Sequence, residues 1–410
     1  MSIDSVATLL NVLRRVQIYT PGQIDEIARE LTPHYDDPRE LVDYLVQMEW
    51  LTPYQREALF EGHWDALTIG QYQLLERLGE GGVSEVFKAW DTRRGCIAAL
   101  KVLRQHLTSS TDAVREFQRE LRSVTHLSHP NVIKTFDADQ VGSMHYFAME
   151  YVEGTDLERY VQKVGPLPLE EACEYIRQVA QGLQHAHQMG LVHRDIKPAN
   201  LFLTNPPPSP GSAAPPSLPG RKADPLIKIL DWGLARLRSL EGRSHDSIVL
   251  YDMEAEKGAL IGTADYIAPE QARDPTLVDT RADLYSLGCT FYYLLTGSPP
   301  FPGSSLMHKL LRHQEEEPPW VRDVRLDVPE EVDAMVQRLL AKEPEERYQI
   351  PLLFIASLRP YCPASGGVIG SVIRPVNGAV PRPAGSSGTI PVFRPGSSVN
   401  LDSSRTEREG

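Results

Sequence analysis

Apolar and polar residues follow two different periods along this chain. Strand-like runs occur at residues 72–78 and 96–101, the second largely apolar, and residues 226–230 alternate between apolar and polar as a strand does. Helical spacing, with apolar side chains on one side, marks residues from about 112 to 127, and an apolar run at 282–296 also predicts a helix. The pattern therefore predicts a chain built from both strands and helices.

The first 66 residues show only the helical pattern. Apolar residues recur with helical spacing over residues 3–16. In three later pairs a capping residue precedes a proline, which is favoured at the first helical position: Thr20-Pro21, Asp37-Pro38 and Thr52-Pro53. These signals predict about four short helices around a small core. Because no catalytic constellation occurs here, residues 1–66 are interpreted as a separate helical module.

Two stretches are rich in residues that disfavour helices and strands. Eight prolines occur within residues 205–225, and a solvent loop and a docking ligand for a proline-reading domain both fit this composition. Residues 360–410 are rich in Gly, Ser and Pro and are expected to form a disordered tail. Within them the pattern Val-x-Arg-Pro starts at Val372, Val380 and Val392. It fits a multivalent docking tail or a linker of biased composition.

Composition indicates an intracellular protein. The four cysteines show neither the paired spacing of a metal site nor a disulfide framework, so a reducing compartment is expected; they are Cys96, Cys173, Cys289 and Cys362. No signal core is visible and no apolar run is long enough to span a membrane, so we expect a cytoplasmic protein. The net charge of −13 disfavours nonspecific nucleic-acid binding and mildly favours basic protein substrates.

The most informative chemistry lies in residues 193–200, His-Arg-Asp-Ile-Lys-Pro-Ala-Asn. Asp195 has the acidity to accept a hydroxyl proton, Lys197 can face the same phosphate, and Asn200 offers an oxygen to Mg²⁺. Asp231 follows the strand expected at 226–230 and would add a second oxygen beside Asn200. Because Mg²⁺ takes only one or two protein oxygens besides phosphates and waters, these residues predict phosphoryl transfer.

A glycine-rich segment lies upstream. Gly79 and Gly81 let backbone N–H groups approach an anion, and Val86 can press on a purine ring, although taken alone this segment also fits an ordinary hairpin. Lys101 ends the next expected strand among aliphatic residues, where a lysine needs a carboxylate and ligand phosphates as partners. Glu120, on the helix expected at 112–127, is the candidate carboxylate.

A further pair is expected to be structural. The segment 262–270 ends in Glu270, shortly before the apolar helix at 282–296. Arg347, near the end of the ordered pattern, is the candidate partner. We expect these two side chains to form a buried bidentate ion pair.

With these residues in order, the chain from about Gln71 to Arg359 resembles the protein kinase superfamily, in its serine/threonine branch and its bacterial, eukaryotic-like form. The resemblance implies an α+β fold of two lobes over residues 71–359, a small antiparallel β-sheet lobe with one helix and a large, mainly α-helical lobe. It also implies transfer of the γ-phosphate of ATP to Ser or Thr of proteins, the chain itself included, with Mg²⁺ or in its place Mn²⁺.

The resemblance also implies a role for each residue. Lys101 binds the α and β phosphates and pairs with Glu120, while Asp195 orients and deprotonates the acceptor hydroxyl. Lys197 assists at the phosphate, and Asn200 and Asp231 hold Mg²⁺. The nucleotide site is a larger set: Leu78, Gly79, Gly81 and Val86 cover the nucleotide, Ala99 and Phe202 sandwich adenine, the backbone of Glu150 and Val152 reads its edge, Met149 is the gatekeeper, and Asp156 contacts the ribose.

Several positions bear on specificity and on departures from the family pattern. Lys197 and Thr263 resemble the residues that accompany serine/threonine specificity. Ser84 stands where a third glycine is usual and is interpreted as neutral. Trp232 replaces a phenylalanine and keeps a large apolar side chain. The proline-rich insert interrupts a hairpin expected between the Asn200 segment and the Asp231 strand.

Regulation is expected between Asp231 and Glu270. Relatives with an arginine at the position of Arg194 often use a phosphorylated residue in this segment. Residues 251–258 contain no Ser or Thr, so one hypothesis is that an acid supplies the counter-charge; the candidates are Asp252, Glu254 and Glu256. Phosphorylation of Ser239, Ser244 or Ser247 is the rival, and fully solvated acids are a third interpretation. If the acids act, reversing the charge of all three should sharply lower basal turnover.

Two other functions stay open at this point. A nucleotide-binding pseudokinase scaffold usually lacks one of the catalytic residues, and all are present here. A small-molecule phosphotransferase of related fold is disfavoured by Arg347 and the segment 262–270. The helical module, whose residues 51–55 resemble leaders of some other bacterial kinases, either packs against the small lobe or serves recruitment or self-association.

Overall fold

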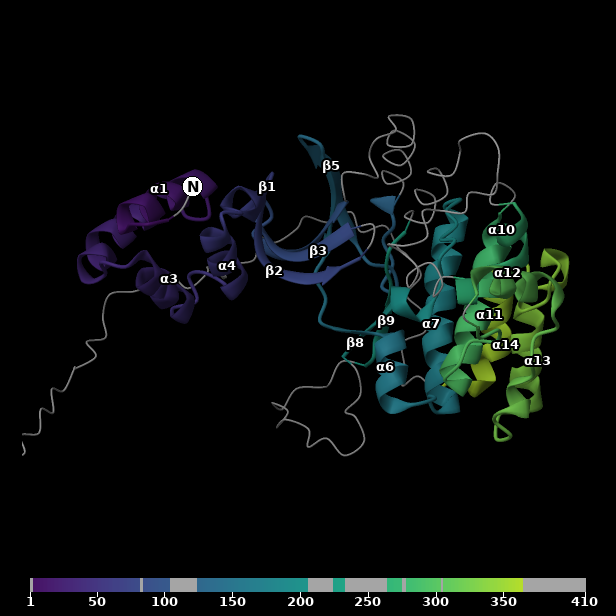
Figure 1. The fold of residues 1–410 in the computed structure, drawn as a ribbon. Coiled ribbons are helices and arrows are strands. Elements are labelled where there is room, and N and C mark those ends of the chain that lie inside the picture. The colour runs from purple at the N-terminus through teal and green to yellow at the C-terminus, as the bar shows by residue number, and fades with distance from the viewer. Residues whose placement is uncertain are drawn as a thin grey trace, which may run out of the picture.

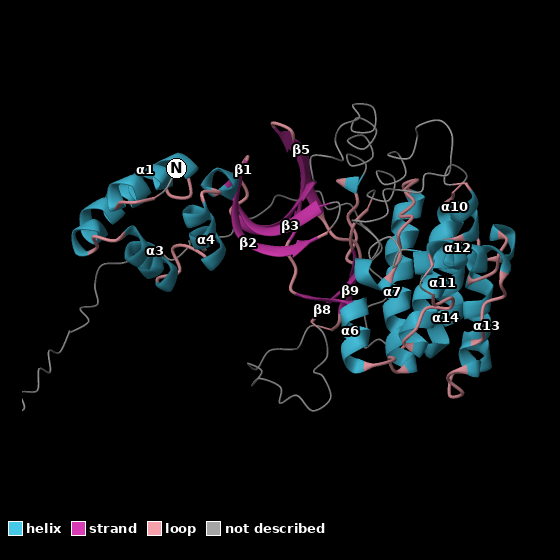
Figure 2. Ribbon diagram, in the orientation of Figure 1, coloured by secondary structure: helices cyan, strands magenta, loops and turns pink. Residues whose placement is uncertain are grey.

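The described part of the chain forms a helical module, a curved β-sheet and a mainly helical body, which follow one another along the molecule (Figure 1). The computed structural model describes residues 3–81, 84–103, 124–205, 224–232, 264–274, 278–303 and 305–363. Figure 2 shows the main sheet in the middle of the molecule and helices at its two ends. Within those ranges, no helix has both the length and the apolar character that crossing a membrane requires.

The N-terminal module contains α1 (Val6–Val16), α2 (Pro21–Glu26), α3 (Pro38–Gln47) and α4 (Pro53–Glu61), with a π-helical turn at Ile27–Leu31 and 3-10 turns at Thr32–His34 and Trp64–Leu67. Thr20, Asp37 and Thr52 cap α2, α3 and α4, and each side chain accepts a backbone N–H while proline occupies the first helical turn. The three helix starts predicted from the sequence are therefore confirmed.

The module has its own apolar core. Side chains without exposed surface come from α1, from the π-helical turn and from α3; they include Leu9, Leu13, Ile27, Leu41 and Leu45. Burying one such side chain contributes about 1.5–3 kcal/mol. The core is therefore large enough to hold these short helices together, although none is long enough to be stable alone.

The middle part is a six-stranded sheet in the order β1-β2-β3-β4-β6-β5. Its strands are β1 (Thr68–Ile69), β2 (Tyr72–Glu80), β3 (Ser84–Asp91), β4 (Cys96–Leu103), β5 (Thr135–Val141) and β6 (Met144–Glu150). All neighbouring strands are antiparallel. The strands predicted at 72–78 and 96–101 are confirmed as β2 and β4.

The two faces of this sheet have different neighbours. Phe87, Leu100 and Ala148 belong to a buried apolar cluster on one face. Because successive side chains of a strand point to opposite faces, Val86 and Lys101 lie on the other face. The sheet therefore presents its proposed nucleotide-binding side chains on the face that this core does not occupy.

The module packs on the sheet. Nε2 of Gln55, in α4, donates a buried 2.8 Å hydrogen bond to the carbonyl of Leu74 in β2. Nε2 of Gln73 donates to the carbonyl of Ile18 at 3.2 Å. The ring of Tyr54 lies 5.9 Å from that of Phe87. Packing against the small lobe, one of the two interpretations of the module, is thus observed, whereas recruitment and self-association stay predictions.

The helical body begins with a small sheet of β7 (Gly154–Asp156), β8 (Leu201–Thr204) and β9 (Leu226–Ile229), in that order. Its helices are α6 (Leu157–Val164), α7 (Leu169–Gln188), α10 (Pro269–Arg273), α11 (Thr280–Thr296), α12 (Leu306–Glu315), α13 (Glu330–Leu339) and α14 (Pro351–Leu358). Short 3-10 turns lie at Pro198–Asn200, Ala264–Tyr266, Val321–Asp323, Pro344–Glu346 and Arg359–Tyr361. The strand predicted at 226–230 and the helix predicted at 282–296 are confirmed as β9 and α11.

Helix α11 is the centre of this body. Every residue from 282 to 295 is buried, so the helix is surrounded by protein on all sides. A Cβ added at Gly288 would lie 2.7 Å from Cβ of Leu339 in α13. The absence of a side chain at Gly288 therefore permits the close approach of α11 and α13.

Several predictions fall outside the described residues. They concern residues 112–123 of the predicted helix, with Glu120, the body of the proline-rich insert, the acids Asp252, Glu254 and Glu256, Thr263, and the tail from residue 364 on. The flanks of the insert are described, and they agree with expectation: β8 and β9 are antiparallel, with Thr204 opposite Leu226. The insert thus joins two strands that pair directly. The boundaries of the predicted domains stay predictions.

Candidate functional site

Asp195, Lys197 and Asn200 form one cluster in the loop directly before β8 of the helical body. Nζ of Lys197 lies 3.1 Å from Oδ2 of Asp195. Nδ2 of Asn200 donates to the same Oδ2 at 3.0 Å and to the carbonyl of Asp195 at 2.7 Å. The structure therefore brings together the three residues that the sequence placed in one motif, around a single carboxylate oxygen.

The ring of His193 fixes the backbone of this loop through two hydrogen bonds. The N–H of Asp195 donates to Nδ1 of His193 at 3.2 Å, so Nδ1 is the acceptor and Nε2 carries the proton. Nε2 then donates to the carbonyl of Leu230 at 2.7 Å. Because the N–H of Leu230 in turn donates to the carbonyl of Asn200, the loop and the residue before Asp231 are locked to each other.

Asp283, on α11, anchors the same loop from the core. Its two carboxylate oxygens accept the backbone N–H groups of His193 and Arg194 at 2.9 and 2.8 Å, and Oδ2 also accepts Nε2 of His187 at 2.8 Å. Arg194 has a φ of 68°, a left-handed conformation that costs energy for a non-glycine residue. The carboxylate of Asp283 therefore compensates a strained turn directly before Asp195.

The charge of Asp283 is stabilised although the residue has no exposed surface. Burial alone would raise the pKa of its carboxyl group. The hydrogen bond and positive potential of His187, together with the His193 backbone N–H, outweigh burial, so the pKa lies below its ordinary value of 3.8. Asp283 is thus an ionised anchor at neutral pH.

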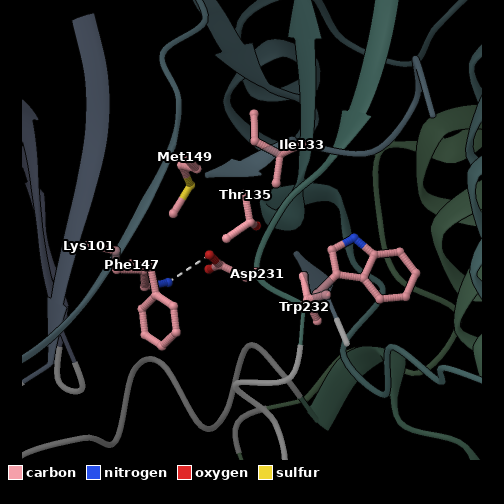
Figure 3. A pocket seen from close by; sticks show the side chains of 8 residues that line it. Lys101, Ile133, Thr135, Phe147, Met149, Asp231 and Trp232 are labelled. Carbon is pink, nitrogen blue, oxygen red and sulfur yellow. Dashed lines mark ion pairs between the residues drawn. The ribbon is translucent and has the colours of Figure 1, made fainter. Parts of the chain in front are cut away.

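Lys101 and Asp231 connect the two lobes (Figure 3). Nζ of Lys101, which is almost fully buried, lies 2.7 Å from Oδ1 of Asp231. Asp231 has a φ of 61°, and this left-handed turn lies two residues after the end of β9. A cation from the sheet therefore faces an acid from the helical body. The expected partner Glu120 lies outside the described residues.

Strand register brings the remaining nucleotide residues together. Gly79 is opposite Val86, Val86 is opposite Lys101, and Ala99 is opposite Met149. The side chains of Val86, Ala99 and Met149 are half-buried, and Leu78, Gly79 and Gly81 are exposed. The residues predicted to cover a nucleotide thus lie on adjacent strands, next to the lysine.

The segment after β6 connects the lobes. The N–H of Glu150 donates to the carbonyl of Lys134, so the carbonyl of Glu150 is the group left for a ligand edge. The Glu150 side chain pairs with Lys228 at 2.7 Å. Val152 is half-buried on the same segment. A contact from the Glu150 backbone to a ligand edge, as expected from the sequence, would therefore be made through its carbonyl.

Asp156 and Phe202 are opposite each other on β7 and β8. Asp156 is also the N-cap of α6, since Oδ1 accepts the N–H of Arg159 at 2.8 Å. This gives the acid a structural role that the sequence analysis did not include. A Cβ at Gly154 would lie 2.1 Å from the carbonyl oxygen of Leu203, so glycine is needed for β7 to approach β8 and bring Asp156 beside Phe202.

Trp232 is a large, buried apolar side chain beside the site, as the sequence predicted. Its ring is 5% exposed and packs edge-on against His193, with 4.7 Å between ring centroids. Its indole Nε1 has no hydrogen-bond partner among the described residues. Trp232 therefore supports the loop that carries Asp195 through packing.

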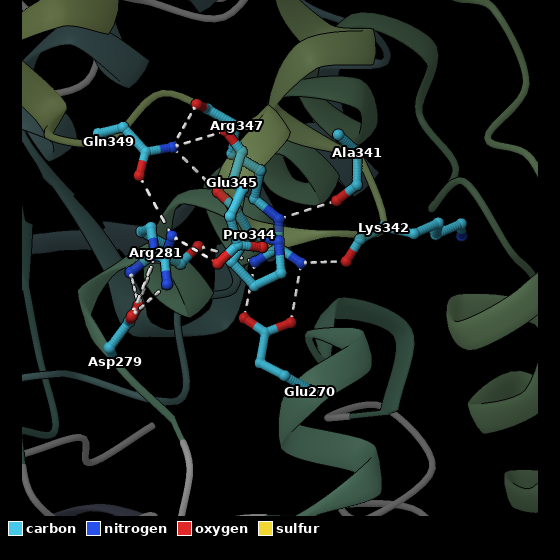
Figure 4. Close-up of polar contacts among 9 residues, drawn as sticks. All are labelled: Glu270, Asp279, Arg281, Ala341, Lys342, Pro344, Glu345, Arg347 and Gln349. Atoms are coloured by element: carbon cyan, nitrogen blue, oxygen red, sulfur yellow. Dashed lines mark hydrogen bonds and ion pairs between the residues drawn. The ribbon is translucent and has the colours of Figure 1, made fainter.

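The predicted pair of Glu270 and Arg347 is confirmed (Figure 4). The guanidinium group donates to Oε1 and Oε2 of Glu270 at 2.7 and 2.8 Å, which is a bidentate geometry. Arg347 has no exposed surface. The pair holds the start of α10 against the end of the helical body, and its role is structural.

Sequence reasoning missed two residues near the site. Asp283 carried a signal, because it is an acid inside an otherwise apolar helical run. Glu158 on α6 carried none: burial and Asp156 raise the pKa of its carboxyl group, and Lys197 opposes that increase. Glu158 therefore lies within electrostatic range of the lysine beside Asp195.

Comparison with known proteins gives the same result for sequence and fold. A family model described as "Protein kinase domain" matches residues 72–355. The serine/threonine-protein kinase PknB of Mycolicibacterium smegmatis is 37% identical over 283 residues, and PknB of Mycobacterium tuberculosis is 37% identical over 285 residues; each alignment covers 68% of this chain and 41% of the relative. The crystal structure of the Mycobacterium tuberculosis PknI kinase domain superposes with a TM-score of 0.54 at 27% identity, covering 72% of this chain and 98% of that domain.

These matches include only part of each curated relative. The chain spans 41% of the length of the two PknB proteins. The shared region is the sheet and the helical body, and it begins after the N-terminal module.

Proposed function

Because the chain belongs to the protein kinase family, in its bacterial, eukaryotic-like serine/threonine branch, we propose that it is an ATP-dependent serine/threonine protein kinase. It transfers the γ-phosphate of ATP to Ser and Thr hydroxyls of proteins, itself included. The observation that carries this proposal is the cluster of Asp195, Lys197 and Asn200 around one carboxylate oxygen.

In this cluster Asp195 is the group that orients the acceptor hydroxyl and takes its proton. Lys197, in contact with this carboxylate, brings a positive charge to the transferred phosphate. Asn200 fixes the rotamer of Asp195 through Nδ2. Transfer then depends mainly on position and charge, as phosphoryl transfer requires.

The donor set fits a hard divalent cation. Because Nδ2 of Asn200 is used on Asp195, its amide oxygen Oδ1 is the atom left to bind a metal. Asp231 supplies the second oxygen, and the bond between Leu230 and Asn200 keeps the two close. Bound Mg²⁺, or Mn²⁺ in its place, supplies charge neutralisation for the phosphates.

The nucleotide is proposed to lie between the sheet and the helical body. Lys101 binds the α and β phosphates, and Glu120 is proposed as its second partner. The other contacts follow the register of the strands: Leu78, Gly79, Gly81 and Val86 cover the nucleotide, Ala99 and Phe202 enclose adenine, Met149 is the gatekeeper, Glu150 and Val152 offer backbone groups, and Asp156 contacts the ribose.

Substrates are proposed to be proteins, with a mild preference for basic ones because the net charge is −13. Signalling in the cytoplasm is the proposed setting. A pseudokinase scaffold and a small-molecule phosphotransferase are the alternatives. Neither is favoured by a specific observation, since the catalytic cluster is complete and the pair of Glu270 and Arg347 is formed.

The test is phosphate transfer from labelled ATP with Mg²⁺ to the protein itself and to a basic generic protein. Wild type is compared with Asp195→Asn, and the labelled sites are mapped by mass spectrometry. We expect label on Ser or Thr that the substitution reduces by a factor of 10² or more, about the share of general-base catalysis. No transfer by a folded protein that binds Mg-ATP tightly would contradict the proposal and favour the scaffold.

A further inference from the structure

A hollow of about 340 Å³ lies between the N-terminal module and the sheet, away from the proposed catalytic cluster. From the module it is lined by Tyr19 and Trp50, and from the sheet by Leu75 and Trp90. These four side chains are half-buried. The volume lies within the range of about 300–1,000 Å³ typical of ligand sites.

The hollow is aromatic and acidic. Glu26 and Glu49 line it, and none of its lining residues is a lysine or an arginine. Among the described residues, neither carboxylate takes part in an ion pair, although ion pairs are common elsewhere in the module. The site is therefore suited to a cationic occupant with apolar surface and disfavours a nucleotide or another anion.

The hollow continues into a second one. This second hollow, of about 430 Å³, shares Glu26 and Trp50 with the first. The π-helical turn Ile27–Leu31 lines it, and such turns are rare and frequent at functional sites. Together the two form a groove around Trp50, here called the tryptophan groove. Arg29 also lines the second hollow, where it pairs with Glu30, so Glu26 and Glu49 are the acids that face an occupant at the first.

The chain itself contains a segment of matching chemistry. In residues 364–400 the only charged side chains are Arg374, Arg382 and Arg394, and each belongs to one of the three Val-x-Arg-Pro copies. Proline restricts both its own backbone and that of the preceding arginine to extended conformations. Each copy thus combines a cation with apolar neighbours on a backbone that loses little entropy on binding.

We propose that the tryptophan groove binds the third Val-x-Arg-Pro copy, residues 392–395 of the same chain. Arg394 pairs with Glu26 and Glu49, while Val392, Phe393 and Pro395 pack against Trp50 and Trp90. Aromatic grooves that receive proline-containing extended peptides are a general recognition mode, and an arginine between carboxylates and indole rings gains from both.

Chain length selects the third copy. The first begins nine residues after Pro363, where the described chain ends, and the third begins twenty-nine residues after it. At 3.3–3.6 Å per residue these segments span at most about 30 and about 100 Å. Figure 1 shows α14 in the helical body and the module at the opposite end of the molecule, so the copy with the longest reach is favoured.

Binding there would join the module to the sheet, because the groove takes residues from both. The bound tail would act as a strap across an interface that already contains the hydrogen bond of Gln55 with Leu74 and the packing of Tyr54 on Phe87. The inference does not rest on the proposed catalytic function, since no step of it involves phosphate transfer.

The experiment places the photoreactive residue benzoylphenylalanine at position 393 of the full-length chain. After irradiation, cross-linked peptides are identified by mass spectrometry. We expect cross-links to peptides of residues 18–52 and 73–97. Arg394→Glu should lower their yield about tenfold, as loss of one charge-assisted contact does. Combining it with Glu26→Arg and Glu49→Arg should restore the yield, because the charges are exchanged.

Two outcomes would overturn the proposal. The first is a cross-linking pattern that does not depend on the groove: position 393 cross-links to other residues, or the yield of cross-links to the groove stays the same in Arg394→Glu. The second comes from a mixture of isotopically light and heavy chains: cross-links between the two would show that the occupant is the tail of a second copy. Because Arg394→Glu alters only the tail, its effect is interpretable even if the charge-exchanged module fails to fold.

Discussion

Arg347 is the largest fully buried side chain of the described residues. Five hydrogen bonds use its guanidinium group: two to Glu270 and one each to the carbonyls of Ala341, Arg281 and Lys342. A planar fork of donors is needed to reach all of them. The charge is therefore fully compensated only in this geometry.

Arg347→Lys is expected to lower the free energy of unfolding by about 3 kcal/mol, because the three donors of a lysine cannot reproduce the bidentate contact with Glu270 together with the bonds to three carbonyls. Urea denaturation measures this change. The matched control is Arg281→Lys, since Arg281 pairs with the exposed acids Asp279 and Glu345 and should cost less than about 1 kcal/mol. Equal losses for both variants would contradict the structural role of the buried pair.

His313 is a buried histidine whose pKa is shifted by its surroundings. Nδ1 bonds to the hydroxyl group of Tyr285 at 2.8 Å, and its ring packs edge-on against Phe301. Burial, and next the nearby charge of Lys342, lower its pKa from 6.5 to about 3. The folded chain therefore keeps His313 neutral at pH values where the unfolded chain protonates it.

This lowered pKa gives an acid-sensitive contribution to stability. Below pH 6.5 the unfolded state binds a proton that the folded state does not, so stability falls as pH falls from 6.5 toward 3. Between pH 7 and pH 5 the loss from this residue is about 2 kcal/mol. His313→Gln should remove that part of the loss in urea denaturation at both pH values. His308→Gln, at an exposed position, is the control substitution and should retain the part of the loss that His313 causes.

At the scale of elements, two helices of the module begin with the same capping box. In α2 the side chain of Gln23 accepts the N–H of Thr20, and in α4 that of Gln55 accepts the N–H of Thr52, both at 2.9 Å. Only Gln55 uses its other amide atom on the sheet, at Leu74. The same local motif therefore starts a helix in both places, and in α4 it also attaches the module to the sheet.

Gln55→Ala is expected to destabilise the module–sheet interface by about 1–2 kcal/mol more than Gln23→Ala, because it also leaves the buried carbonyl of Leu74 unpaired. Hydrogen exchange measured over residues 68–80 should rise several-fold in the first variant and little in the second. Similar exchange in both would mean that Gln55 acts only as a cap.

At the scale of the whole molecule, Lys101 and Asp231 connect the sheet with the helical body. Their ion pair, at 2.7 Å, lies where the phosphates of the nucleotide are proposed to bind. A nucleotide with its metal ion would bind both lobes at once. Bound nucleotide should therefore stabilise the two lobes together more than it would stabilise either lobe alone.

Mg-ATP at about 100 times its dissociation constant should raise the free energy of unfolding by about 2.7 kcal/mol. Lys101→Met should remove most of this gain at the same concentration, since its ammonium group is the proposed phosphate contact. Chelation of Mg²⁺ by EDTA should reduce the gain in wild type. Thermal unfolding measures each effect, and Lys163→Met, on the exposed side of α6, is the control. A full gain in Lys101→Met would contradict the proposed site.

The sequence alone was sufficient for local structure. The capping pairs at Thr20, Asp37 and Thr52 predicted helix starts that are observed, strand-like apolar runs predicted β2 and β4, and alternation predicted β9. These signals act between residues a few positions apart, so neighbours in the sequence are enough to produce them. The bidentate pair of Glu270 and Arg347 was also predicted, because its two residues stood in recognisable motifs.

Tertiary structure decided the contacts between distant segments. Asp283 holds the turn before Asp195 across about ninety residues, and Gln55 attaches the module to Leu74. The sequence left the role of the module open between two interpretations and gave Asp283 no role. The physical reason is that a buried acid or amide is fixed by the donors and acceptors that packing brings to it, and packing follows from the whole chain.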